Sequence, residues 1–103
     1  MAQIDDSKRM EEHLDEVLSM VKTHLRRACK KHPEWPENLT DAALIVSEEA
    51  GELCRAVLDM KYHEGHLADV WEEACHTAAT AVRLLVNMVG VPRDSEGKEV
   101  SRG

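Results

Sequence analysis

The sequence predicts an all-α fold: a helical bundle of three main helices per chain, completed by dimerisation or tetramerisation. Apolar residues recur at steps of three and four along three separate segments, which is the period of an amphipathic helix, and no segment carries a strand signal. Aromatic residues are scarce, so Leu, Val, Ala and Met must fill the interior, which suits helices better than sheets. A chain of 103 residues buries well under three quarters of the surface that its unfolded form exposes, and oligomerisation is a natural way to gain core.

The first helix is expected to start at a cap among residues 5–7 and to stop near Lys31, ahead of Pro33. Its apolar stripe consists of Met10, Leu14, Val17, Leu18, Val21, Leu25 and Ala28. Pro33 and Pro36 then bracket Trp35 in a stiff loop. This ring is expected either to stack on a ligand or to cover one end of the bundle.

The second helix is expected to begin at a cap provided by Asn38 or Thr40 and to end at Gly65. Its stripe consists of Ala43, Val46, Ala50, Leu53, Val57 and Met60. Gly51 lies inside this helix, where it costs about 1 kcal/mol relative to Ala. Two explanations stay open, a close approach of another backbone or a tolerated accident.

The third helix is expected over roughly Leu67 to Val89, with Gly90 and Pro92 ending it. Its inward stripe consists of Val70, Trp71, Ala74, Ala78, Ala81, Leu85 and Met88. The helical domain is therefore assigned to residues 1–92. Residues 93–103 are polar and rich in small side chains, which predicts a disordered tail.

Composition argues against several classes of partner. The net charge of −7 disfavours a nucleic-acid backbone or an anionic membrane. No apolar run approaches the roughly 18 residues of a membrane span, and the N-terminus does not resemble a signal peptide, so a cytoplasmic location is expected. Cys29, Cys54 and Cys75 are odd in number and widely spaced, which predicts buried free thiols.

Two pairs of residues suggest chemistry. Glu49 and Glu52 are three residues apart, and so are Glu73 and His76, so each pair shares one face of its helix. Two such pairs on facing helices would place three carboxylates and an imidazole around one point, which outlines a divalent-metal site. The imidazole is the unusual member, because it is a poor ligand for Mg²⁺.

The helical positions of the acids distinguish them further. At about 100° per residue, Glu49 falls between apolar directions while Glu48 projects to the opposite face. On the third helix, one polar stripe contains Asp69, Glu73, His76, Thr80, Arg83 and Asn87. This stripe suits a phosphate chain extended along the helix, with Arg83 taking a distal phosphate. The alternative is a solvated face on which charges happen to align.

The segment from Ala43 to Leu85 resembles the MazG-like all-α nucleoside triphosphate pyrophosphohydrolases. Their signature is E-E-x-x-E on one helix and E-x-x-D on the next; residues 48–52 match the first half, and residues 73–76 match the second half except at the last position. The resemblance implies a bundle that forms a dimer or a dimer of dimers. It also implies a Mg²⁺-dependent reaction in which water splits a (deoxy)nucleoside triphosphate substrate into monophosphate and pyrophosphate.

Matched position by position, the resemblance assigns metal-binding roles to Glu49, Glu52 and Glu73, and His76 stands where the family has aspartate. Glu48 matches the leading acid, which binds metal or positions water. Glu48 and Glu52 are both candidates for the catalytic base, and the sequence does not choose between them. Substrate-binding roles are expected for Trp35, Arg83 and Asn87.

Three interpretations of His76 stay open. In the first, it ligates Mn²⁺ or another transition metal. In the second, it contacts phosphate while Asp69 supplies the missing carboxylate. In the third, the site is degenerate, leaving a module that binds a nucleotide or a protein partner without turnover. A plain dimeric bundle with solubilising acids is a further alternative. Surface positions are expected for His13, His24, His63 and His66, while His32 is undecided.

Overall fold

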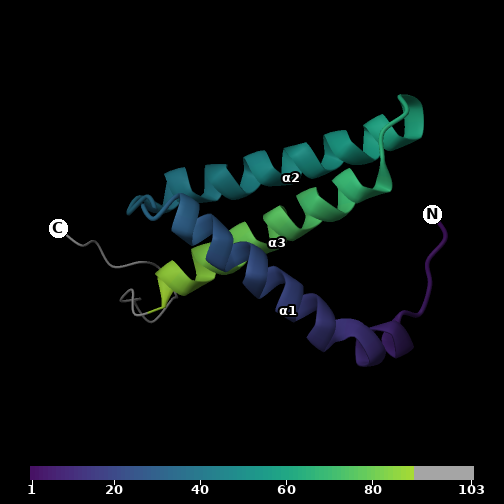
Figure 1. Cartoon of the computed structure of the whole chain (residues 1–103), viewed down its shortest axis with the longest axis horizontal. Coiled ribbons are helices and arrows are strands. Elements are labelled where there is room, and N and C mark those ends of the chain that lie inside the picture. The colour runs from purple at the N-terminus through teal and green to yellow at the C-terminus, as the bar shows by residue number, and fades with distance from the viewer. Residues whose placement is uncertain (90–103) are drawn as a thin grey trace.

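The computed structural model describes residues 1–89, which contain three helices and no strand, so the predicted all-α class is confirmed (Figure 1). The helices are α1 (Ser7–Lys31), α2 (Leu39–Tyr62) and α3 (Leu67–Met88). Their bounds agree with the predicted ones to within a few residues. The predicted end of the domain at residue 92 and the predicted tail over 93–103 lie outside the described residues.

Local chemistry accounts for both ends of α1. The Asp5 carboxylate accepts hydrogen bonds from the backbone N–H of Ser7, at 3.0 Å, and from its hydroxyl, at 2.6 Å. Lys30 and Lys31 occupy the last turn, where cations offset the negative end of the helix dipole. The helix ends just before Pro33, whose ring disfavours helical backbone in the preceding residue.

The two ends of α2 depend on specific side chains. Asn38 caps the N-terminus, because its side-chain oxygen accepts a hydrogen bond from the Asp41 backbone at 3.2 Å. After the C-terminus, a Cβ on Gly65 would lie 2.8 Å from the backbone carbon of Asp59, so only glycine allows this tight turn. A Cβ on Gly51, by contrast, would meet no atom of residues 1–89 within 4 Å. Among these residues, no close backbone approach explains Gly51.

The α2 and α3 helices lie side by side, joined by a short loop, and α1 crosses α3 obliquely (Figure 1). The α3 helix is the central element, since it contacts both of the others. The buried side chains of the described region are mostly small; they are Val21, Ala42, Ala56, Cys75 and Ala79. Small residues allow the helices to approach closely, but they leave the single chain with a thin core.

Large apolar side chains lie mostly outside this core, which corrects several of the predicted stripes. Trp71 was expected to face inward, yet it is 53 % exposed, and Leu85 is 61 % exposed. On the N-terminal half of α1, which diverges from the other helices in Figure 1, Met10, Leu14, Val17 and Leu18 are also exposed. These side chains do recur with helical periodicity, as predicted, but most of them do not face the interior of the single chain. The buried contacts are made mainly by small residues.

The cysteines are free thiols, as predicted, but only Cys75 is buried; Cys29 is half-buried and Cys54 is exposed. The prediction of burial was therefore wrong for Cys54. It lies on a part of α2 that no other helix of the described chain covers. Within residues 1–89, no helix has both the length and the apolar character that a membrane span requires.

Candidate metal centre

Three of the predicted ligands meet between α2 and α3. Glu49, near the middle of α2, and Glu73 and His76, one turn apart on α3, each offer a ligand atom within 4.8 Å of the other two. Thr77 holds the helices in register here, because its hydroxyl lies 2.8 Å from the Glu73 carbonyl and 3.1 Å from the Glu49 carbonyl. The structure thus brings together two of the three predicted carboxylates and the imidazole, while Glu52 is not part of this group.

The two carboxylates are held in an unfavourable state. Glu49 Oε2 and Glu73 Oε2 are covered from solvent and have no hydrogen-bond partner within the described residues. Burial raises the pKa of both carboxyl groups, the negative charge of Glu52 raises each pKa further, and His76 partly opposes the shift. Covered, unpaired carboxylate oxygens are costly, and a cation would relieve both at once. The residues present therefore fit a bound metal ion.

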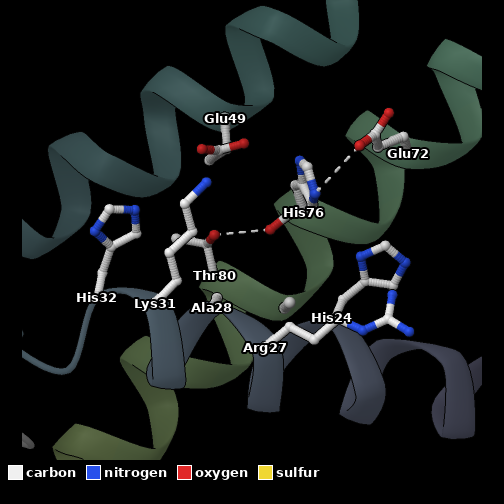
Figure 2. Close-up of a pocket in the computed structure, with 10 residues that line it drawn as sticks. His24, Arg27, Ala28, Lys31, His32, Glu49, Glu72, His76 and Thr80 are labelled. Atoms are coloured by element: carbon white, nitrogen blue, oxygen red, sulfur yellow. Dashed lines mark hydrogen bonds and ion pairs between the residues drawn. The ribbon is translucent and has the colours of Figure 1, made fainter.

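His76 lies among these acids with both ring nitrogens facing carboxylates. Its Nδ1 is 3.9 Å from Glu73 Oε2, and its Nε2 is 4.0 Å from Glu72 Oε1 (Figure 2). The Thr80 hydroxyl donates a 2.7 Å hydrogen bond to the His76 carbonyl one turn earlier. An imidazole in this donor set favours transition-metal ions more than an all-carboxylate set would.

A second imidazole, His24 of α1, contacts the His76 ring, which the sequence did not indicate. The ring centroids of His24 and His76 are 5.4 Å apart and the rings meet edge to face, at 69°. His24 is half-buried, so its expected surface position was wrong. Spacing within α1 cannot reveal this contact, because it depends on how α1 packs against α3.

A cavity of about 460 Å³ opens between α1 and the α2–α3 pair (Figure 2). Arg27 and Lys31 line it from α1, one turn apart, while Glu49, Glu72 and His76 line it from the other side. Lys31 extends toward Glu49 in the close-up view. One wall therefore offers cations and the other offers metal-ligating groups. The sequence pattern indicated only an apolar stripe on α1 and did not point to these two cations.

A second cavity, of about 240 Å³, adjoins the first and shares Glu49 and Thr80 with it. Trp35 lines this part, together with Leu25 and Ile45. The Arg83 guanidinium lies over the Trp35 ring, at 4.9 Å from its centroid, and donates a 2.8 Å hydrogen bond to a backbone carbonyl, that of His32. In this structure Arg83 therefore binds the loop that carries Trp35.

The other predicted site residues lie around this centre rather than in it. Glu52 is exposed, but its charge acts on the carboxylates of both Glu49 and Glu73, and exposed Glu48 acts on Glu49. Asp69 is exposed at the first turn of α3 and is not part of the group of ligand atoms within 4.8 Å. Asn87 donates a 2.9 Å hydrogen bond to the Arg83 carbonyl, four residues before it.

No family model, no curated protein and no solved structure matches this chain. The case for a function therefore depends on the arrangement of the site residues.

Proposed function

We propose that this chain is a divalent-metal-dependent nucleotide pyrophosphohydrolase. It hydrolyses (deoxy)nucleoside triphosphates to monophosphate and pyrophosphate, as a housekeeping enzyme of the cytoplasmic nucleotide pool. The observation that carries the proposal is the pair of covered carboxylate oxygens of Glu49 and Glu73, which have no hydrogen-bond partner within the described residues and lie beside His76. Glu49 and His76 also line a cavity whose opposite wall carries Arg27 and Lys31.

The charges on the two walls suit a metal-bound polyphosphate. A triphosphate carries close to four negative charges, which the acidic wall alone would repel. A divalent ion, Mg²⁺ or a transition metal such as Mn²⁺, supplies charge neutralisation and polarises the phosphate when bound. Arg27 and Lys31 supply the remaining positive charge, and the Arg27 guanidinium is suited to two-point contacts with phosphate oxygens.

The two adjoining cavities suggest how a nucleotide would lie. Cavities of roughly 300–1,000 Å³ are typical of small-molecule sites, and the charged cavity alone falls in this range. The smaller cavity has an aromatic ring, Trp35, and aliphatic neighbours, which suit a base. Glu49 lines both, so the metal centre would lie near their junction. Glu48 and Glu52 stay alternatives for the catalytic base, since both are exposed and the negative charge of each raises the pKa of Glu49.

We also infer that the functional unit is a homodimer or a homotetramer. The support is the set of large apolar side chains that one chain leaves exposed, among them Leu14, Leu18 and Trp71. A second copy that covers them would supply the core that the small contact residues do not.

The direct test is incubation of the purified protein with a panel of nucleoside triphosphates and either Mg²⁺ or Mn²⁺, with pyrophosphate and monophosphate measured together. Pyrophosphate release that Glu49→Gln abolishes and Glu11→Gln preserves is expected; Glu11 is an exposed acid on α1 and serves as the matched control. Absence of pyrophosphate from every substrate, together with no nucleotide binding in calorimetry, would refute the proposal.

The second candidate is a module of the same fold that binds a nucleotide or a protein partner without turnover. Its support is His76, an imidazole where the resembling family carries an aspartate. A His76→Asp variant separates the two candidates. Activity that appears only in this variant would favour the module, whereas activity already present in the unmodified chain excludes it.

A further inference from the structure

We propose that His24 of α1 is a direct ligand of the metal ion held by Glu49, Glu73 and His76. The completed centre then has two imidazoles and two carboxylates, and it binds Zn²⁺, Mn²⁺ or Co²⁺ in preference to Mg²⁺. The inference rests on the proposed function only in requiring that this site holds a metal; it does not depend on which substrate is hydrolysed.

The separation of the two rings fits a shared ion. A metal–nitrogen bond of about 2.1 Å puts each imidazole centroid roughly 3.2 Å from the metal, so two rings on a tetrahedral ion have centroids about 5.2 Å apart. The His24 and His76 centroids are 5.4 Å apart. The two ring centres, on α1 and α3, therefore have the spacing expected for two imidazoles on one ion, but the rings must reorient from their 69° edge-to-face contact to direct both nitrogens at it.

The surroundings leave room for the small movement that ligation requires. The His24 nitrogens are outside the group of ligand atoms within 4.8 Å, so the side chain must turn toward Glu49 and Glu73. His24 lines the open cavity of about 460 Å³ together with His76 and is half-buried, so open space borders its side chain on the side that faces the cavity (Figure 2). Neither covered carboxylate oxygen has a hydrogen-bond partner within the described residues, and the nearest imidazole nitrogen to Glu73 Oε2, His76 Nδ1, is 3.9 Å away.

The donor set decides which ion is favoured. Mg²⁺ prefers oxygen ligands and retains several waters, whereas imidazole nitrogen suits Zn²⁺ and other transition-metal ions. Each added imidazole therefore increases the preference for a transition metal. One imidazole, His76, gives only a modest preference for a transition-metal ion. With His24 as a second nitrogen ligand, the two imidazoles and two carboxylates form a donor set that favours a transition-metal ion more strongly.

The test uses the full-length protein labelled with ¹⁵N and titrated with Zn²⁺ alone. Long-range ¹H–¹⁵N spectra report which of the six imidazoles bind the ion, because ligation moves the resonance of the bound nitrogen. Two imidazoles are expected to respond at one equivalent of Zn²⁺. His76→Asn should remove one of these signals and His24→Asn the other, while His13→Asn, on the exposed part of α1, should remove neither.

Calorimetry gives a second readout. Loss of a residue that only hydrogen-bonds to a metal ligand typically weakens metal binding 10- to 100-fold. Loss of a direct ligand in His24→Asn should therefore weaken Zn²⁺ binding by about 100-fold. Mg²⁺ binding should change by less than about threefold, because Mg²⁺ depends on the carboxylates. The His13→Asn control should leave both affinities unchanged.

The outcomes separate the two proposals. If only His76 responds to Zn²⁺ and Glu49→Gln still abolishes binding, His24 is not a ligand but the metal site stands. If no imidazole responds and Glu49→Gln leaves Zn²⁺ binding unchanged, the metal site fails as well. Should His24→Asn lose its helical circular dichroism, Asn variants of the other histidines identify the His24 signal by elimination, and its failure to respond would overturn the proposal.

Discussion

Replacing Glu49 with Gln should make the metal-free protein more stable and remove its stabilisation by metal. The substitution keeps the size of the side chain and removes one of two negative charges whose oxygens lie within 4.8 Å of each other. It also gives the covered oxygen of Glu73, which has no partner in the described region, an amide N–H that can donate to it. Both effects favour the folded state.

The magnitude can be worked from the geometry. Two like charges 4.8 Å apart repel by about 1 kcal/mol at the dielectric constant of water and by about 3.5 kcal/mol at an effective value of 20. Both residues are partly exposed, so screening places the gain near the lower figure. In a domain of this size, about 1 kcal/mol raises Tm by roughly 4–8 °C.

Bound metal should stabilise the unmodified protein but not Glu49→Gln. A ligand present at 100 times its Kd stabilises the folded state by about 2.7 kcal/mol, so Mn²⁺ should raise the Tm of the unmodified protein well above that of its metal-free form. In Glu49→Gln this increase should disappear, because the centre has lost a charged ligand.

Thermal unfolding followed by circular dichroism, with EDTA or with Mn²⁺, measures both effects. Glu11→Gln carries the same change of charge at an exposed position on α1 and should reproduce the unmodified protein in both conditions. A Glu49→Gln variant that is less stable without metal, or that retains the full increase in Tm with Mn²⁺, would refute the electrostatic account of the site.

Three further predictions address the fold, the loop and the pH dependence. Gly51→Ala should stabilise the chain by about 1 kcal/mol in urea unfolding, because Ala has the higher helix propensity and a Cβ there meets no atom of residues 1–89 within 4 Å; a loss of stability instead would indicate that a partner subunit packs against Gly51. Arg83→Met should lower the free energy of unfolding by about 1–3 kcal/mol, because the 2.8 Å hydrogen bond to the His32 carbonyl and the contact with the Trp35 ring are lost. In a Trp71→Phe background, the Trp35 fluorescence should shift to longer wavelength, and unchanged emission would contradict this role of Arg83. Glu49 and Glu73 have raised pKa values in the folded state, so the folded protein binds protons at these groups more tightly than the unfolded chain does. Without metal, their contribution to the free energy of unfolding should therefore fall as pH rises from the ordinary pKa of 4.5 through the raised pKa. Metal affinity should rise over the same pH range, because the metal binds the deprotonated carboxylates. Urea unfolding at several pH values with EDTA, compared with a Glu49→Gln, Glu73→Gln variant, measures this slope, and equal slopes in the two proteins would contradict it.

The fold was predictable because its information is local. Steps of three and four in the apolar residues, an Asn38 cap and a Gly65 stop each depend on neighbours within one helix. The identity of the element that covers each apolar face is not local. Trp71 lies on a stripe that periodicity identifies as apolar, but the contacts in one chain are made by Ala79 and other small residues beside it.

The same distinction explains the site. Glu49, Glu73 and His76 were predictable from spacing because α2 and α3 are consecutive helices joined by a short loop, so equal spacings face each other. His24 and the nearby cations belong to α1, and no spacing in the sequence relates them to the acids. The interaction of Arg83 with the loop was equally hidden, since its acceptor, the His32 carbonyl, is 51 residues away.

The site residues come from two parts of the bundle, the α2–α3 pair and α1, and these parts are held in place by different contacts. The carboxylates come from α2 and α3, while His24, Arg27 and Lys31 come from one face of α1. In the single chain α1 is held to the bundle through α3, and its N-terminal half presents an uncovered apolar stripe. A second copy that buries this stripe would fix the direction of α1 and therefore the position of the cations and the second imidazole relative to the acids. Assembly and metal affinity are then coupled: a substitution such as Leu18→Asp, in the exposed apolar stripe of α1, should weaken self-association in analytical ultracentrifugation and weaken Zn²⁺ binding together.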